Sequence, residues 1–202
     1  MEGLTMFKIG QFLVLFTFLA FISDIRKKEG MTPLVNSKLI LAMKLCYLIL
    51  LCSYAYMLIT MDMLSPLDFI ALAVTSLGTF LVVKAKMDLR RHHTWAGYRF
   101  KTTKLVTEGI YAFIRHPLYT GVYIFILGGL SIGIARLGGL STSILREPWV
   151  LTNIGLTLVY IMALLPIIAT RESKLLAREF GQEFLAYKER VHAFLPLRKF
   201  KG

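Results

Sequence analysis

The sequence has very few cysteines for its length. Only two of its 202 residues are cysteines, Cys46 and Cys52, and both fall within one apolar stretch. They form neither a disulfide framework nor the Cys-x-x-Cys spacing of a metal site, so we interpret them as packing residues. Internal repeats and low-complexity segments are also absent from the sequence. A disulfide-based scaffold and a repeat architecture are therefore excluded.

Acidic residues are also scarce. The chain has 12 Asp and Glu against 24 Lys and Arg. Such an excess of positive charge is typical of proteins that bind nucleic acid or an anionic membrane face. Here 56% of the residues are hydrophobic and the mean hydropathy is +0.63, whereas soluble domains have roughly 45–50% apolar residues. We therefore predict an integral membrane protein whose basic residues face anionic lipids, with no nucleic-acid partner.

Five apolar segments approach the length of about 20 residues that a membrane-spanning helix needs. The first is followed by Asp-Ile-Arg-Lys-Lys and lacks a small-x-small cleavage site, so we expect a retained anchor rather than a cleaved signal peptide. Asp62, Ser65 and Pro66 break the chain between the second and third segments, which therefore form a hairpin. Small residues such as Gly78 and Gly128 allow the third and fourth segments to approach closely. The predicted fold is an all-α integral membrane protein with five transmembrane helices at residues 7–23, 39–61, 67–86, 119–137 and 149–169.

Basic residues gather in three segments, and this distribution predicts the orientation. The segments are the loop 24–38, residues 84–118 and the tail after residue 170. The remaining loops and the N-terminus have only Lys8, Arg136 and Arg146. Because positive charge favours the cytoplasmic side, five spans place the N-terminus outside and the C-terminus in the cytoplasm. All three basic segments then lie on the cytoplasmic face.

The tail has the pattern of an amphipathic helix. Apolar residues recur at helical spacing with Lys, Arg and Glu between them. We expect this helix to lie at the membrane surface or to dock on the cytoplasmic segment 87–118. The apolar residues are Leu176, Phe180, Phe184, Tyr187 and Val191.

Segment 87–118 mixes basic, aromatic and histidine side chains. An interfacial belt of a membrane protein has the same composition, so this interpretation stays open. The pair His92–His93 suggests a haem or metal site, but adjacent side chains diverge and no partner pair lies at ligand spacing. We therefore predict no metal site.

The triplet Arg115-His116-Pro117 stands at the start of the fourth span. Proline lacks an N–H and clashes with the preceding turn, so Pro117 either starts a helix or kinks one. If it lies in the first helical turn, the free N–H groups there form a site for negative charge, with Arg115 and His116 at its mouth. Tyr119 would add a ring and a hydroxyl, and Gly121 a close approach of the backbone. The alternative is that His116 only caps the helix.

Two spaced motifs resemble those of the isoprenylcysteine carboxyl methyltransferase and phospholipid methyltransferase superfamily. Residues 105–121, LVTEGIYAFIRHPLYTG, are similar to its pattern L-V-x-x-G-x-Y-x-x-x-R-H-P-x-Y-x-G. The tail is similar to its element E-E-x-x-L-x-x-x-F-G-x-x-(Y/F)-x-x-Y, which closes on an apolar-proline end. Trp95 stands where the superfamily often has a tryptophan. The matching residues are Leu105, Val106, Gly109, Tyr111, Arg115, His116, Pro117, Tyr119 and Gly121 in the first motif, and Glu172, Leu176, Phe180, Gly181, Phe184, Tyr187, Phe194, Leu195 and Pro196 in the second.

The resemblance implies a methyltransferase that uses S-adenosylmethionine. The first motif and the tail would enclose the cofactor at the cytoplasmic face, and a lipophilic methyl acceptor would enter from the bilayer. The chain would then consist of a three-span membrane region, residues 1–86, and a catalytic region, residues 87–202. The implied cofactor-binding residues are Leu105, Val106, Gly109, Tyr111, His116, Pro117, Tyr119, Gly121, Phe194, Leu195 and Pro196.

The predicted catalytic residues are Glu172, Arg171 and Arg115. With a prenylcysteine carboxylate as acceptor, Arg171 or Arg115 would hold the carboxylate in line with the methyl group. With a phospholipid amine, which is the second prediction, Glu172 would accept the proton. The sequence departs from the superfamily where its paired glutamates become Glu172-Ser173, and where Ile168 replaces an arginine that is common one turn earlier.

Two functions of other classes stay open. A membrane reductase of the sterol-reductase kind would bind NADPH, but it needs more polar contacts than five short spans offer. A non-catalytic protein could hold anionic lipids on the basic face. Conservative changes at His116 or Glu172 would matter little to that protein, whereas they would abolish turnover by an enzyme.

Overall fold

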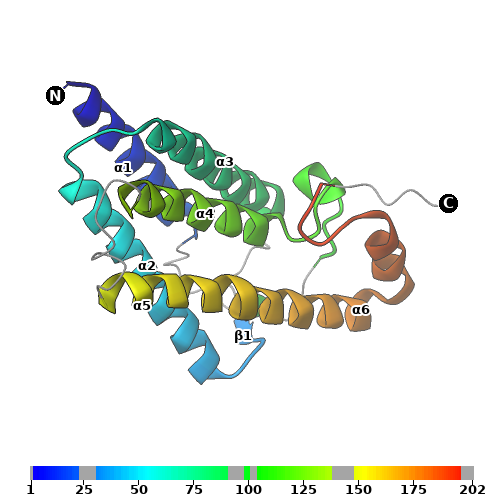
Figure 1. Ribbon diagram of the computed structural model, residues 1–202. Helices are drawn as coiled ribbons and strands as arrows, with labels where there is room; N and C mark the ends of the chain where they lie inside the picture. Colours follow the sequence, from blue (N-terminus) through cyan, green and yellow to red (C-terminus); the bar gives the residue numbers. More distant parts are fainter. Residues whose placement is uncertain (1, 23–30, 91–97, 101–103, 138–147, 197–202) are drawn as a thin grey trace.

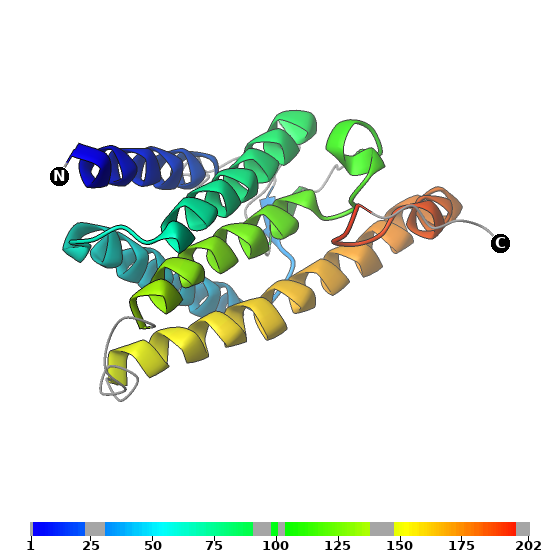
Figure 2. The same cartoon turned by 45° about the horizontal axis from the view of Figure 1, so that its top comes forward.

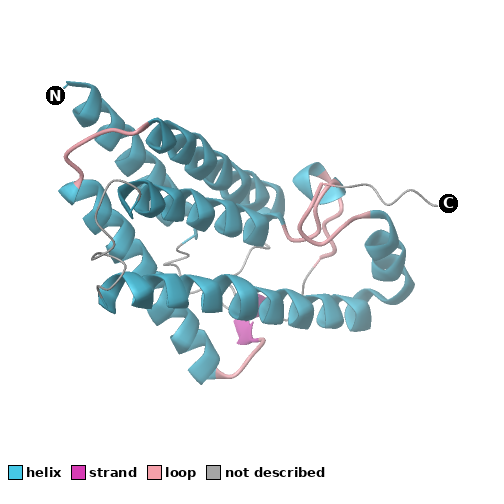
Figure 3. Cartoon of the chain, in the orientation of Figure 1, coloured by secondary structure: helices cyan, strands magenta, loops and turns pink. Residues whose placement is uncertain are grey.

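Helices make up most of the computed structural model (Figure 3). The structure describes residues 2–22, 31–90, 98–100, 104–137 and 148–196. Three long helices come first, and the predicted site region follows them in the chain (Figure 1). The helices are α1 (Glu2–Ile22), α2 (Ser37–Thr60), α3 (Pro66–Leu89), the short 3-10 helix η2 (Gly109–Ala112), α4 (Pro117–Leu137), α5 (Pro148–Val159) and α6 (Leu165–Arg190).

Within the described residues, four helices are long and apolar enough to cross a membrane. They are α1, α2, α3 and the continuous helix formed by α5 and α6, which qualifies over Gly155–Arg190. The fifth, α4, is apolar over the shorter stretch Pro117–Ile132. The prediction of a mostly helical, multi-pass membrane protein is thereby confirmed.

The turn between α2 and α3 has the residues that the sequence analysis identified as breaks. Ser65 caps α3, and Pro66 occupies its first turn. Asp68 accepts a hydrogen bond from the Ser65 N–H at 2.6 Å, which closes a capping box. The predicted break between the second and third spans is confirmed.

Small residues let α3 and α4 pack in close contact. A Cβ atom on Gly78 would lie 2.5 Å from the Phe125 nitrogen, and one on Gly121 would lie 2.7 Å from the Gly78 oxygen. One on Gly128 would lie 2.9 Å from the Thr75 nitrogen. Larger residues would force the two backbones apart, so the pair behaves as one rigid unit. The core extends from this pair to α1, because the rings of Phe18 and Phe125 stack with centroids 3.7 Å apart.

The fifth span and the tail form one long helix, which corrects the expectation of a span ending at residue 169 followed by a separate tail helix. The π-helical turn η4 (Tyr160–Leu164) joins α5 directly to α6 (Figure 2). This wider turn comes just before Pro166, whose ring would clash with the preceding turn of a regular helix. No further break occurs until Gly181, where a φ of +50° redirects the last turns of α6.

A small antiparallel sheet is present that the all-α prediction did not include. Strand β1 (Met31–Pro33) pairs with β2 (Tyr98–Phe100), and Thr32 stands opposite Arg99. Nearby, Lys86 donates a hydrogen bond to the Phe21 carbonyl at the end of α1. The described parts of the loop 24–38 and of the segment 84–118 therefore meet at one end of the bundle. Of the predicted charge distribution, residues 24–30, 91–97, 101–103 and 197–202 and Arg146 lie outside the described part of the chain.

Candidate active site

His116 lies at the junction between α4 and α6. Pro117 starts α4, and the His116 carbonyl accepts a hydrogen bond from the Thr120 N–H at 3.0 Å. The buried imidazole reaches α6, where its Nε2 is 3.0 Å from the Ser173 hydroxyl oxygen. Its Nδ1 is 3.6 Å from a carboxylate oxygen of Glu172. Pro117 therefore starts the helix rather than kinking it, and His116 does more than cap it.

The two neighbours of the imidazole favour one arrangement of its protons. A carboxylate beside Nδ1 favours a proton on that nitrogen, which leaves Nε2 free to accept the hydroxyl hydrogen of Ser173. The Glu172 side chain is 40% exposed, whereas that of His116 is only 5% exposed. The Glu172 side of this cluster is therefore exposed at the protein surface, whereas the His116 imidazole is enclosed.

Aromatic rings flank His116 on two sides. The Tyr119 ring centroid is 5.6 Å away and that of Phe194 is 5.8 Å away. Tyr119 also lies close to the Glu172 carboxylate. The first motif and the tail thus bring together one carboxylate, one imidazole, the Ser173 hydroxyl and the rings of Tyr119 and Phe194.

The end of the tail runs alongside the first motif. The N–H groups of Arg115 and His116 donate to the carbonyls of His192 and Ala193, each at 2.9 Å. Further hydrogen bonds run from Arg115 Nε to the Val191 carbonyl at 2.8 Å and from the Thr120 hydroxyl to the Phe194 carbonyl at 3.0 Å. The end of the tail therefore contacts the first motif directly, which agrees with one of the two arrangements predicted for the tail. Burial lowers the pKa of the Arg115 guanidinium, and nearby Tyr187 partly opposes that shift.

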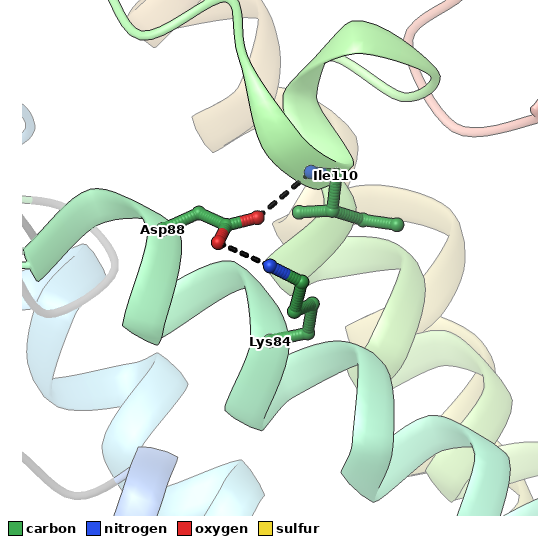
Figure 4. Close-up of polar contacts among 3 residues, drawn as sticks. All are labelled: Lys84, Asp88 and Ile110. Carbon is green, nitrogen blue, oxygen red and sulfur yellow. Dashed lines mark hydrogen bonds and ion pairs between the residues drawn. The ribbon is translucent and has the colours of Figure 1, made fainter.

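Helix η2 is held from two sides. Tyr187 donates a hydrogen bond from its hydroxyl to the Tyr111 carbonyl at 2.6 Å. On the other side, Asp88 accepts a hydrogen bond from the Ile110 N–H and pairs with Lys84 (Figure 4). Burial raises the pKa of the Tyr111 phenol well above its usual value, and the charge of Glu172 raises it further. Tyr111 therefore stays neutral and firmly placed.

Comparison with known proteins identifies the family. The phospholipid methyltransferase family matches residues 67–183, more than half of the chain. The chain belongs to the phospholipid methyltransferase family. The matched region contains α3 from its second residue, all of η2, α4 and α5, and most of α6. It includes His116, Glu172 and Ser173 and begins earlier than residue 87, at the start of α3.

The chain is also similar to the protein-S-isoprenylcysteine O-methyltransferase of Schizosaccharomyces pombe. The two are 31% identical over 132 residues, which are 63% of this chain and 48% of the relative. The matched part thus spans about half the length of that curated relative. The resemblance to the isoprenylcysteine and phospholipid methyltransferase superfamily is thereby confirmed.

The structure brings only some of the predicted site residues of this family member together. His116, Tyr119, Glu172 and Phe194 form the cluster, and the buried Pro117 adjoins it. Arg171, Leu195 and Pro196 are exposed, while Val106 is half-buried. Their predicted roles remain predictions.

Two of the predicted cofactor-binding residues have packing contacts instead of a place beside His116. Leu105 packs on a cluster formed by Phe184, Tyr187 and Val191 of the tail. Gly121 lies against Gly78 and Val82 of α3. The short motif therefore combines residues that build the site with residues that hold the scaffold around it.

Sequence reasoning missed two residues, Asp88 and Thr120. Asp88 was detectable only as an acid four residues after Lys84 in a basic segment, which suggests a helical ion pair but not a contact with Ile110. Thr120 lies within the first motif, yet it occupies a position that the superfamily pattern leaves open.

The side chains around His116 suit parts of S-adenosylmethionine. A carboxylate and aromatic faces stabilise a cation such as a sulfonium or an ammonium group. Within the described part of the chain, no group of three or more His, Cys, Asp and Glu could hold a metal ion. His92, His93 and Trp95 lie outside that part.

Proposed function

We propose that this protein is an integral membrane methyltransferase that uses S-adenosylmethionine and methylates the carboxylate of a prenylcysteine-type acid. The observation that carries the proposal is the cluster of His116, Tyr119, Glu172, Ser173 and Phe194. Family membership supports a methyltransferase, and the name of the fission yeast relative supports a prenylcysteine acceptor.

The chain's own residues would contribute position and charge. S-adenosylmethionine, when bound, supplies the electrophilic methyl group. Glu172 and the faces of Tyr119 and Phe194 would hold its positive charge, and His116 would fix the Glu172 carboxylate. Positioning and exclusion of water are then the main contributions of the protein to an in-line displacement. An ionised carboxylate acceptor needs no base, because it attacks the methyl carbon directly while the carbon–sulfur bond breaks.

The polar groups of the cluster favour an acid over an amine. An ammonium acceptor must lose a proton before or after it is methylated, so it needs a base. Glu172 already has His116 and Tyr119 as partners. Ser173 stands at the position of the superfamily's second glutamate, so the cluster has no second carboxylate that could act as the base. Arg171, exposed on the same turn, is available to hold an acidic acceptor.

The second candidate is a phospholipid amine acceptor. The family name favours it, since the match covers α3 to α6 under the description of phospholipid methyltransferase. In that reaction the Glu172 carboxylate would have to give up its contact with His116 and accept a proton from the acceptor ammonium instead. An assay with both acceptor classes separates the two candidates.

The site would lie at the cytoplasmic face, with the N-terminus outside. The arrangement at one end of the bundle supports this placement. This end contains the β1–β2 pair, the end of α3 and the tail contacts, and basic residues are concentrated there. Anionic lipids would contact these basic residues, and the acceptor would reach the site from the bilayer.

Calorimetric titration of the detergent-purified protein with S-adenosylhomocysteine tests the cofactor. We expect binding by the wild type and loss of binding in His116→Ala. His192→Ala is the matched control, because His192 contributes its backbone carbonyl to the tail contact. It should bind like the wild type. Binding of NADPH instead would favour the sterol-type reductase, and binding of neither would favour a non-catalytic lipid-binding protein.

Methyl transfer from labelled S-adenosylmethionine then tests the acceptor. We expect label in N-acetyl-S-farnesylcysteine and none in phosphatidylethanolamine vesicles. Label in the phospholipid alone would replace the acid by the amine as the acceptor.

A further inference from the structure

Asp88 lies at the point where the third span meets the predicted cofactor-binding segment. It belongs to the last turn of α3, which ends at Leu89. One carboxylate oxygen accepts a hydrogen bond from the Ile110 N–H at 2.7 Å, and the other is 2.5 Å from the Lys84 ammonium. Figure 4 shows the carboxylate between these two partners. Both oxygens are thus used, and only 16% of the side chain is exposed.

The carboxylate also explains the glycine of the first motif. Gly109 has a φ of +62°, which side chains rarely adopt. A Cβ atom there would lie 2.2 Å from an Asp88 oxygen, closer than any contact allows. Gly109 is therefore required both by its backbone conformation and by the carboxylate that approaches it.

This contact restrains the whole segment between Ile110 and Pro117. Its start is tied to α3 by Asp88, and its end enters α4, which is packed against α3 through Gly78 and Gly121. Because both ends are attached to one rigid pair of helices, the few residues between them have little freedom. Tyr111 and His116 lie within this restrained stretch.

We propose that Asp88 is a positioning residue of the site, which acts through the Ile110 N–H to place Tyr111 and His116 for the cofactor. Lys84 supports it by holding the second carboxylate oxygen. This proposal rests on the proposed function, since it assigns a role toward S-adenosylmethionine. Asp88 itself touches neither cofactor nor acceptor.

The test uses two measurements on the full chain in detergent. Hydrogen exchange of the backbone amides in peptides that cover residues 104–116 reports on the restraint itself, without any cofactor. Titration with S-adenosylhomocysteine reports on the site. The variants are Asp88→Ala, which removes the acceptor, Asp88→Asn, which keeps an oxygen but removes the charge, and Lys84→Met. The control is Asp62→Ala, an exposed carboxylate in the turn that precedes α3, far from Asp88 at the end of that helix.

In Asp88→Ala we expect exchange in these peptides to accelerate and affinity to fall about tenfold or more, the scale for a lost hydrogen bond to a charged group. Asp88→Asn should lose only about threefold, because an oxygen still accepts from Ile110. Lys84→Met should lie between the wild type and Asp88→Ala, and Asp62→Ala should match the wild type. Thermal unfolding confirms that each variant is folded.

Unchanged exchange in Asp88→Ala overturns the proposal, whatever the wild type binds. Faster exchange with unchanged affinity also overturns it, because Asp88 would then serve the fold alone. If the wild type does not bind S-adenosylhomocysteine, the proposed function fails, and with it the cofactor role of Asp88. Faster exchange in the variant would then show that the restraint on η2 is real but serves another purpose.

Discussion

His116 has two polar neighbours on α6 that differ in charge. Glu172 is an acid, whereas Ser173 stands where the superfamily has a second glutamate and is hydrogen-bonded to Nε2 at 3.0 Å. A neutral partner at this nitrogen leaves the site with one negative charge instead of two. At the scale of single residues, this is a feature in which the site departs from the superfamily pattern.

Ser173→Glu and Ser173→Ala separate charge from hydrogen bonding. The alanine variant loses one hydrogen bond, worth about 1 kcal/mol or a fewfold in catalytic efficiency. The glutamate variant adds a negative charge beside an anionic acceptor, so we expect its kcat/KM for a prenylcysteine acid to fall at least tenfold below that of the alanine variant. Steady-state kinetics with labelled cofactor provide the measurement. A glutamate variant as active as the wild type would contradict the role given to Ser173.

Gly109→Ala is expected to be damaging for two reasons. The left-handed conformation costs an alanine about 1–2 kcal/mol. The new methyl group would also displace the Asp88 carboxylate, which lies 2.2 Å from its position. We expect a lower thermal unfolding temperature in detergent and weaker binding of S-adenosylhomocysteine.

Gly155→Ala is the control for Gly109→Ala, because nothing lies within 4 Å of a Cβ atom at that helical position. It should be neutral or slightly stabilising. Equal effects of the two substitutions would argue against a special role of Gly109.

At the scale of elements, α6 contributes to the site at two places. Its first half carries Glu172 and Ser173 to His116, and its last turns, redirected at Gly181, return Tyr187 to the Tyr111 carbonyl. The chain then continues beside the first motif as far as Phe194. One element therefore encloses the short segment 109–116 from both ends.

Tyr187→Phe tests the docking of the tail. It keeps the ring in the cluster with Phe184 and Val191 and removes only the hydroxyl, so we expect a loss of about 1 kcal/mol in docking. Limited proteolysis should then cut the tail faster than in the wild type, and added S-adenosylhomocysteine should restore part of the protection. Tyr56→Phe, at an exposed position in α2, is the control. Identical cleavage of both variants would show that the hydroxyl does not hold the tail.

At the scale of the whole molecule, the described parts of the basic segments and the candidate site share one end of the helical bundle. This arrangement follows from the short turn between α2 and α3 and from the packing of α4 against α3, which return the chain repeatedly to the same end. The opposite end has the α2–α3 turn, where Lys8 of α1 donates to the Ile59 carbonyl.

Single-cysteine labelling tests the orientation that the charges predict. In a background with Cys46 and Cys52 replaced by serine, Asp62→Cys should react with a membrane-impermeant maleimide in intact cells. Lys174→Cys should react only after the membrane is permeabilised, because α6 then lies on the cytoplasmic side. The reverse pattern would invert the topology and move the site to the outer face.

Much of the architecture was predictable because it depends on local properties of the chain. Long apolar runs define the spans, since the bilayer demands about 20 apolar residues in a helix. Ser65, Pro66 and Asp68 define the start of α3 by contacts within a few residues. The two motifs identified the superfamily, and His116, Tyr119, Glu172 and Phe194 do lie together.

Only the tertiary structure decided the features that join distant parts of the chain. The contacts of Asp88 with Ile110 and of Met31 with Phe100 join residues far apart in sequence, and neither has a local signature. The continuation of the fifth span into α6 depends on whether the helix around Pro166 can widen, which single-residue preferences do not reveal. From the sequence alone, Gly121 could serve either cofactor binding or helix packing. Its close contact with α3 in the structure shows that it packs against that helix. The sequence by itself determined the helices and the chemistry of the motifs, and long-range packing decided which of those residues meet.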